Sequence, residues 1–286
     1  MNSKKKAPHL AILLATYNGE PYLQEQLRSL MDQSHKAFTL YIHDDDSTDE
    51  TSAIIKKFQK EHPSKIHYFD DDITLKTAAG NFNYLLQKVD ADYFMFCDQD
   101  DIWFSDKVER TLHAMRALEE KHQDQPCMLF SDLEVVDEQG KTIADSLWRS
   151  QKLSPQLIYD TKEILTLNVV TGCTIMINNS AKAVVSPIPA QDIEHDHWIA
   201  IHLSKYGYSA FIDAPLMKYR QHSSNTLGAN DGGLSYLLMK TKKILQNREL
   251  FIKKYSHFNF RVSLPEILLT KIRLNLHRLL KWRSLF

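Results

Sequence analysis

The chain has 286 residues, 43% of them hydrophobic and 25% charged, which is the composition of an ordinary globular protein. Three widely spaced cysteines, Cys97, Cys127 and Cys173, exclude a disulfide framework and a cysteine metal cluster. No run reaches the roughly eighteen apolar residues of a membrane span, and no cleavable leader pattern is present, so we expect a cytoplasmic protein.

The net charge of −1 hides a strong asymmetry along the chain. Residues 232–286 carry twelve lysines and arginines against two acids, a net of +10, which leaves −11 for residues 1–231. Such a division predicts an anionic partner at the C-terminal end. We therefore expect a main domain over residues 1–231 and a basic helical extension over residues 232–286. We expect no nucleic-acid partner.

The first hundred residues alternate apolar runs with amphipathic segments. Strands are predicted at residues 9–16, 38–43, 66–69 and 93–97. A helix follows each of the first three strands, the second opening at Ser47 with the Ser47–Glu50 spacing of a capping box and the third spanning residues 81–89. This alternation favours right-handed crossovers and an α/β fold with a Rossmann-like, mainly parallel sheet.

The second part of the chain is less regular. We expect a helix from Asp106 to about His122, an apolar β-branched run at residues 168–177 and a helix at residues 193–206. Further strands are predicted at residues 128–136, 141–144 and 208–212. The segment from Lys218 to His222 then leads into a loop rich in serine, asparagine and glycine.

Two C-terminal helices are predicted, at residues 234–260 and 264–286. On the second, one face carries Leu268, Leu269, Ile272, Leu276 and Leu279, and the other carries Lys271, His277, Arg278 and Lys281. One interpretation packs the apolar face on the domain and leaves the basic face in water. The other holds the helices at an anionic membrane surface.

A buried strand at residues 93–97 stops abruptly at Asp98, Asp100 and Asp101. Carboxylates this close repel one another, and Mg²⁺ or Mn²⁺ relieves that repulsion while sharing its other positions with phosphates. A solvated acidic turn is the alternative. Since ligands bind at the carboxyl ends of parallel strands, this edge predicts a metal and diphosphate site. Neither a dinucleotide nor a P-loop glycine pattern follows the first strand, which counts against those enzymes.

Five short motifs in order resemble family 2 glycosyltransferases of the GT-A fold, with bacterial rhamnosyltransferases of cell-wall and surface polysaccharides the nearest likeness. The resemblance covers roughly residues 8–231. The motifs are ATYNG (15–19), HDDDSTD (43–49), CDQDD (97–101), EHDHW (194–198) and YRQHSSNT (219–226).

The resemblance implies roles for the residues of the first three motifs. Thr16, Tyr17 and Asp45 match positions that hold the nucleotide base and ribose of a donor. Asp98 and Asp100 match the D-x-D of the family, with Asp100 as the direct metal ligand and Asp98 in support or in contact with the sugar. Asp101 is expected to cap the following turn.

The last two motifs bring residues from late in the chain. Asp196 matches the catalytic base, and we expect the helix dipole and neighbouring imidazoles to keep it ionised. Here His195 replaces the usual glutamate of that motif. His222 matches a histidine that reaches the metal or the diphosphate. Arg220 is expected to contact the diphosphate, with a salt-bridge role as the alternative.

Together these observations predict an inverting, metal-dependent glycosyltransferase using Mn²⁺ or Mg²⁺. The resemblance implies a dTDP- or UDP-sugar as donor, with dTDP-β-L-rhamnose as the specific expectation. It implies a saccharide or lipid-linked saccharide as acceptor, with the protein peripheral at the inner face of the cell membrane. The alternatives are a nucleotidyltransferase and a non-catalytic saccharide-binding or assembly protein on a degenerate transferase scaffold.

Overall fold

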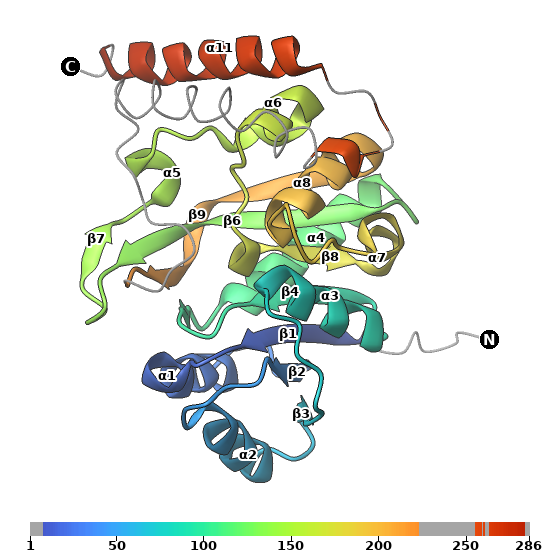
Figure 1. The fold of residues 1–286 in the computed structure, drawn as a ribbon, viewed down its shortest axis with the longest axis vertical. Coiled ribbons are helices and arrows are strands. Elements are labelled where there is room, and N and C mark those ends of the chain that lie inside the picture. Colours follow the sequence, from blue (N-terminus) through green and yellow to red (C-terminus); the bar gives the residue numbers. More distant parts are fainter. Residues whose placement is uncertain (1–7, 223–254, 259, 261–262, 284–286) are drawn as a thin grey trace.

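The computed structural model describes residues 8–222, 255–258, 260 and 263–283 (Figure 1). Its N-terminal elements are β1 (Leu10–Thr16), α1 (Glu20–Met31), β2 (Thr39–Asp44), α2 (Thr51–Glu61), β3 (Ile66–Phe69), α3 (Ala78–Lys88), β4 (Tyr93–Cys97), β5 (Ile102–Trp103) and α4 (Lys107–Lys121). They are followed by β6 (Cys127–Val136), β7 (Thr142–Ala144), α5 (Leu147–Ser150), η1 (Pro155–Tyr159), α6 (Thr161–Thr166), η2 (Gly172–Thr174), β8 (Met176–Asn178), α7 (Asn179–Val185), α8 (His195–Tyr206), β9 (Tyr208–Arg220) and α11 (Leu264–Arg283).

All strands of the described residues belong to one sheet, in the order β3-β2-β1-β4-β8-β6-β9-β5, with β7 paired to β6. Strands β1, β2, β3, β4, β6 and β9 run in one direction, and only the short strands β5, β7 and β8 oppose them. The mainly parallel sheet predicted from the sequence is therefore confirmed. Its carboxyl edge collects the ends of β1, β2 and β4.

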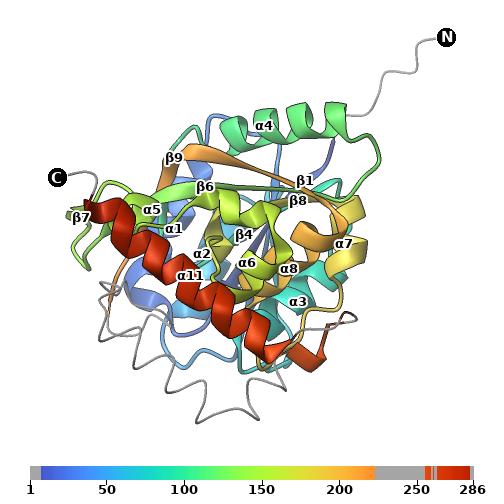
Figure 2. The same cartoon turned by 90° about the horizontal axis from the view of Figure 1, so that it is seen from above.

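Strand β1 shows why the sheet is covered on both faces. Leu10, Ile12 and Leu14 pack into one core with α1, α2 and α4, whereas Ala11 and Leu13 pack into a second core with α3, α7 and α8. Alternate side chains of a strand point to opposite faces, so an unbroken apolar run requires helices on both sides. Figure 2 shows α4 on one side of the strands and α3 and α8 on the other.

Two local predictions are wrong. Helix α2 begins at Thr51 and not at Ser47, because the Ser47 hydroxyl is bound to the Asp44 carboxylate at 2.7 Å, and Asp49 accepts the Thr51 amide instead. The apolar β-branched run at 168–177 is mostly irregular or 3₁₀ backbone instead of extended strand, and from it only the segment beginning at Met176 pairs in the sheet, as β8 (Met176–Asn178). In both segments short-range hydrogen bonds compete with the predicted element. Asp44 binds Ser47, and the carbonyls of Thr171 and Gly172 accept the amides of Thr174 and Ile175.

Strand β9 extends eight residues beyond the predicted end, to Arg220, pairing with β6 as far as Val136. This extension carries Arg220 and the following His222 to the carboxyl edge of the sheet. The serine- and asparagine-rich loop, the predicted domain boundary at residue 231 and nearly all of the first C-terminal helix lie outside the described residues.

Helix α11 packs on α6 (Figure 2). The side chains it buries are not those of the leucine face that the packing interpretation placed against the domain. Among the side chains of α11 whose burial is described, Ile267 and Leu274 are buried. Leu269, Ile272 and Leu276, which belong to the predicted apolar face, are instead 67%, 49% and 52% exposed. Within the described ranges, no helix combines the length and apolarity needed to cross a bilayer.

Candidate active site

The ends of β1 and β2 are joined by hydrogen bonds between buried side chains. Thr16 donates its hydroxyl to the Asp44 carboxylate at 2.6 Å, and the Asp45 amide donates to the Thr16 carbonyl at 2.9 Å. Asp44 also accepts the amide of Ser47 at 2.9 Å. Asp44 is therefore a structural acid that ties the two strand ends together.

Asp45 and Tyr17 border the surface beside this joint. Asp45 is buried and accepts the backbone amide of Leu75, from the segment between β3 and α3. Tyr17 is 57% exposed and lies directly after β1. The three residues expected to hold a nucleoside, Thr16, Tyr17 and Asp45, thus lie at one corner of the carboxyl edge.

The D-x-D motif follows β4 at the same edge. Asp98 is partly buried, and its burial together with the charges of Asp100 and Asp196 raises its pKa to about 7. Asp100 approaches His222, with 2.7 Å between its Oδ2 and the histidine Nε2. The Tyr22 ring stacks on His222 with the ring centroids 4.8 Å apart. The two predicted metal ligands, 122 residues apart in the chain, are therefore in contact.

The sequence suggested that Asp101 caps the turn after the motif. In the structure it does not. It is 1% exposed, and its Oδ1 accepts the backbone amide of Arg220 at 3.4 Å. Oxygen atoms of Asp98 and Asp101 and the sulfur of Cys173 lie within 4.8 Å of one another. Burial and the charges of Asp100 and Asp98 raise the pKa of Asp101 well above its usual range.

A buried cation beneath this motif was missed in the sequence. Lys107 donates its Nζ to the Cys173 carbonyl at 2.9 Å and lies 4.4 Å from the centre of the Trp103 ring. Burial lowers the pKa of Lys107 to about 8. A signal was available, since helical spacing places Lys107 on the buried face of α4 with Thr111 and Met115.

Asp196 lies in the first turn of α8, where the helix dipole favours a carboxylate. Its charge and that of Glu194 act on Asp98, so the expected base and the D-x-D motif belong to one site. The neighbouring imidazole does not contribute positive charge, contrary to the prediction. His195 is buried with its ring 4.3 Å from that of Phe82, and burial lowers its pKa to about 3, which leaves it neutral.

Two further aromatic residues near the start of this helix, His197 and Trp198, belong to the core. His197 is buried, and its Nε2 lies 2.7 Å from the Ile164 carbonyl oxygen. Trp198 is also buried and donates its indole N–H to the Val185 carbonyl at 2.7 Å.

Arg220 is 3% exposed, and its guanidinium is engaged with protein acceptors. Nε donates to the Asp100 carbonyl at 3.1 Å, Nη1 donates to the Glu138 carbonyl at 2.7 Å, and Nη2 pairs with the Glu25 carboxylate at 2.5 Å. Arg220 therefore holds the backbone of the loop that carries Asp100.

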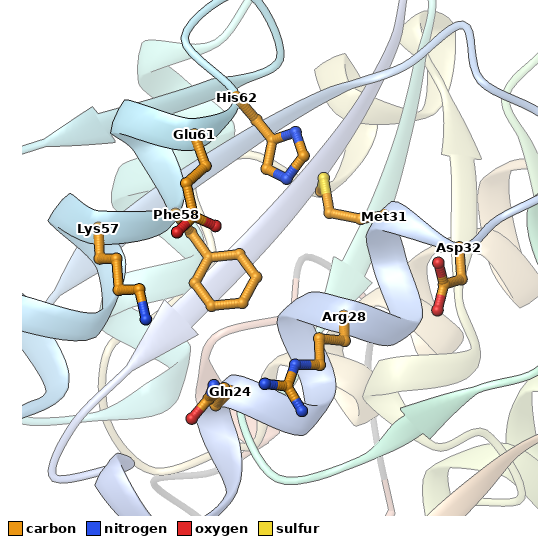
Figure 3. Close-up of a pocket in the computed structure, with 8 residues that line it drawn as sticks. All are labelled: Gln24, Arg28, Met31, Asp32, Lys57, Phe58, Glu61 and His62. Atoms are coloured by element: carbon orange, nitrogen blue, oxygen red, sulfur yellow. The ribbon is translucent and has the colours of Figure 1, made fainter.

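A pocket between α1 and α2 lies away from this edge (Figure 3). It is lined by Gln24, Arg28, Met31, Asp32, Lys57, Phe58, Glu61 and His62. These residues occupy the middle and C-terminal turns of the two helices, which in a parallel crossover lie toward the amino ends of the strands. The pocket is thus separate from the acidic site.

The sequence pattern described as "Glycosyl transferase family 2" matches residues 11–184, more than half of the chain. The chain belongs to glycosyl transferase family 2. The matched region of this transferase contains Thr16, Asp45 and the D-x-D motif, whereas Asp196 and His222 lie beyond it. The family resemblance predicted from the five motifs is confirmed.

Individual proteins show the same likeness. The dTDP-rhamnosyl transferase RfbG of Shigella flexneri is 32% identical over 228 residues, covering 76% of this chain and 74% of that protein. TuaG of Bacillus subtilis (strain 168), named for teichuronic acid biosynthesis, is 26% identical over 228 residues, covering 78% and 82%. The mannosyltransferase PcManGT of Pyrobaculum calidifontis, solved with GDP-Man and Mn²⁺, superposes with a TM-score of 0.57 at 14% identity, covering 93% and 70%. The fold of this family 2 transferase is GT-A.

Proposed function

We propose that the protein is an inverting, metal-dependent transferase that moves L-rhamnose from dTDP-β-L-rhamnose onto a saccharide acceptor in cell-wall or surface polysaccharide synthesis. The observation that carries this proposal is the gathering of the D-x-D acids, His222 and Asp196 at one edge of the sheet. The likeness to RfbG and to TuaG supports the donor and the pathway class.

The nucleoside of the donor would bind at the corner formed by Thr16, Tyr17 and Asp45. Thr16 and Asp45 are buried and joined by a backbone hydrogen bond, so they offer a rigid floor, and the exposed Tyr17 offers a ring to the base or ribose. The diphosphate would then extend toward Asp98 and Asp100. Family members with other sugars use the same fold, so sugar choice depends on a few pocket contacts.

Asp100 and His222 are the residues that would hold Mn²⁺ or Mg²⁺, since a carboxylate oxygen and an imidazole nitrogen already meet there at 2.7 Å. Both atoms are ligands that Mn²⁺ accepts. When bound, the ion would neutralise negative charge on the departing nucleotide diphosphate.

Asp196 would act as the general base. Its carboxylate takes the proton of the acceptor hydroxyl while the acceptor oxygen forms a bond to the anomeric carbon. The bond between that carbon and the diphosphate oxygen breaks, and its electron pair leaves with the nucleotide diphosphate. The two oxygens are on opposite sides of the carbon, so the configuration inverts.

The acceptor is proposed to be lipid-linked and held at an anionic membrane surface, at the inner face of the cell membrane. The exposed Leu269, Ile272 and Leu276 stand three and four residues apart on α11 and form one aliphatic stripe. The net charge of +10 over residues 232–286 would draw this stripe to anionic lipid.

The proposal is tested by incubating the full-length protein with dTDP-, UDP- and GDP-sugars and a saccharide acceptor, with Mn²⁺ or Mg²⁺, and measuring release of nucleotide diphosphate. We expect release from dTDP-β-L-rhamnose that a chelator abolishes. The Asp196→Asn variant should lose about 10²–10⁴-fold in rate. Glu120→Gln, an exposed acid on α4, is the matched control.

Other outcomes identify what is wrong. Release from another nucleotide sugar alone overturns the rhamnose assignment. No release from any donor, with saccharide binding retained, indicates the non-catalytic alternative. Formation of a nucleotide sugar from a nucleoside triphosphate and a sugar phosphate indicates a nucleotidyltransferase. A fully active Asp196→Asn protein removes the proposed base.

A further inference from the structure

The middle residue of the D-x-D motif, Gln99, makes a paired contact with the loop after β1. Its Oε1 accepts the Tyr17 amide at 2.8 Å, and its Nε2 donates to the Tyr17 carbonyl at 2.9 Å. A side-chain amide thus meets a backbone peptide as a neighbouring strand would. The contact joins the loop that carries Asp98 and Asp100 to the loop that carries Thr16 and Tyr17.

Gly19 provides the room for this contact. Its φ of −98° is open to any residue, so the need for glycine is one of space and not of backbone conformation. A Cβ at this position would lie 2.3 Å from Oε1 and 2.6 Å from Cδ of Gln99. The Gly19 backbone cannot easily retreat, because its amide donates to Thr51 Oγ1 at 2.8 Å and its carbonyl accepts the Leu23 amide at the start of α1.

We propose that Gln99 is a positioning residue that sets the spacing between the nucleoside corner and the metal-binding acids. This inference rests on the proposed function. In a nucleoside diphosphate the base and the phosphates are covalently joined, so both ends bind fully only if the two loops stand at the matching distance. A pre-organised spacing saves the cost of ordering the loops on binding.

Titrating the parts of the ligand separately distinguishes a positioning role of Gln99 from a purely structural one. Thymidine contacts only the nucleoside corner, inorganic diphosphate with Mn²⁺ contacts only the acids, and dTDP with Mn²⁺ spans both. Loss of the spacing weakens the spanning ligand and leaves the two fragments bound as before. General damage to the fold weakens all three.

The experiment is calorimetric titration of the full-length wild-type, Gln99→Ala and Gln99→Glu proteins with these three ligands. For Gln99→Ala we expect dTDP affinity in Mn²⁺ to fall about tenfold, the equivalent of one or two net hydrogen bonds. Fragment affinities should stay within about twofold. Gln99→Glu should behave likewise, because its carboxylate faces the Tyr17 carbonyl oxygen without a donor. Gln87→Ala on the exposed face of α3 is the matched control.

A double-mutant cycle with Gly19→Ala tests the geometry independently. Gly19→Ala alone should weaken dTDP binding, since its methyl group meets Gln99. In the Gln99→Ala background the same methyl group should cost little, so the two effects should be strongly non-additive. Additive effects would overturn the inference, as would Gln99→Ala weakening the fragments as much as dTDP. If wild-type protein binds neither dTDP nor UDP, the donor assignment itself fails, whereas normal dTDP binding by Gln99→Ala overturns this inference alone.

Discussion

Replacing Arg220 removes the side chain that holds the backbone of the loop carrying Asp100. The Arg220→Met substitution would leave the carbonyl oxygens of Asp100 and Glu138 without their guanidinium donors. Both hydrogen bonds are partly buried, and an acceptor that loses its donor away from water costs about 1–3 kcal/mol. The Glu25 carboxylate is 58% exposed and regains water, so its loss adds little. We therefore expect the free energy of unfolding to fall by about 3 kcal/mol and the Tm by roughly 6–12 °C.

Thermal unfolding followed by circular dichroism measures this loss, and a Mn²⁺ titration reports on the position of Asp100. Glu25→Ala is the matched control: it removes only the ion pair to Arg220, so its Tm should stay within about 3 °C of the wild type. An Arg220→Met protein with wild-type Tm and Mn²⁺ affinity, but weaker nucleoside diphosphate binding, would refute this reasoning. Arg220 would then be the diphosphate contact that its sequence position predicts.

Two further predictions concern the metal and the membrane. Because burial and neighbouring acids raise the pKa of Asp98 to about 7, the metal-free protein loses stability as pH rises toward and through 7, and Mn²⁺ should raise the Tm more at pH 8 than at pH 6. Asp98→Asn should reduce that difference, and an unchanged difference contradicts the prediction. Replacing Leu269, Ile272 and Leu276 with serine should lower partition onto anionic vesicles at least about tenfold. Ile143→Ser, equally exposed on β7, should not, and equal partition of both variants rules out the membrane contact.

The order of elements was readable from the sequence because it depends on local periodicity. Strand β3 and strand β4 begin and end where the apolar runs do, and the alternation with helices predicted the parallel sheet. The cap of α2 was not readable in the same way. Ser47 has two competing partners, a helix amide three residues on and the Asp44 carboxylate, and the geometry of the strand ends decided between them.

For the candidate site, too, the sequence determined some features and the tertiary structure decided others. The sequence by itself determined that acids end β2 and β4 and that these ends share an edge, since strand direction follows from the crossovers. It also marked Asp196 and His222 as candidates through the family motifs, although their roles stay predictions until tested. Contact between Asp100 and His222 required the long register of β9 on β6, which no local pattern specifies.

Only the tertiary structure decided which charged and polar groups face inward. His195 and Arg220 have polar neighbours in the sequence, yet packing from other elements buries both side chains. Packing also decided which residues of α11 are buried. Helical periodicity defined an aliphatic face, but contact with α6 buried Ile267 and Leu274 and left Leu269 exposed. A sequence pattern states which residues share a face of one element. What covers that face depends on segments up to a hundred or more residues away, and only packing resolves it.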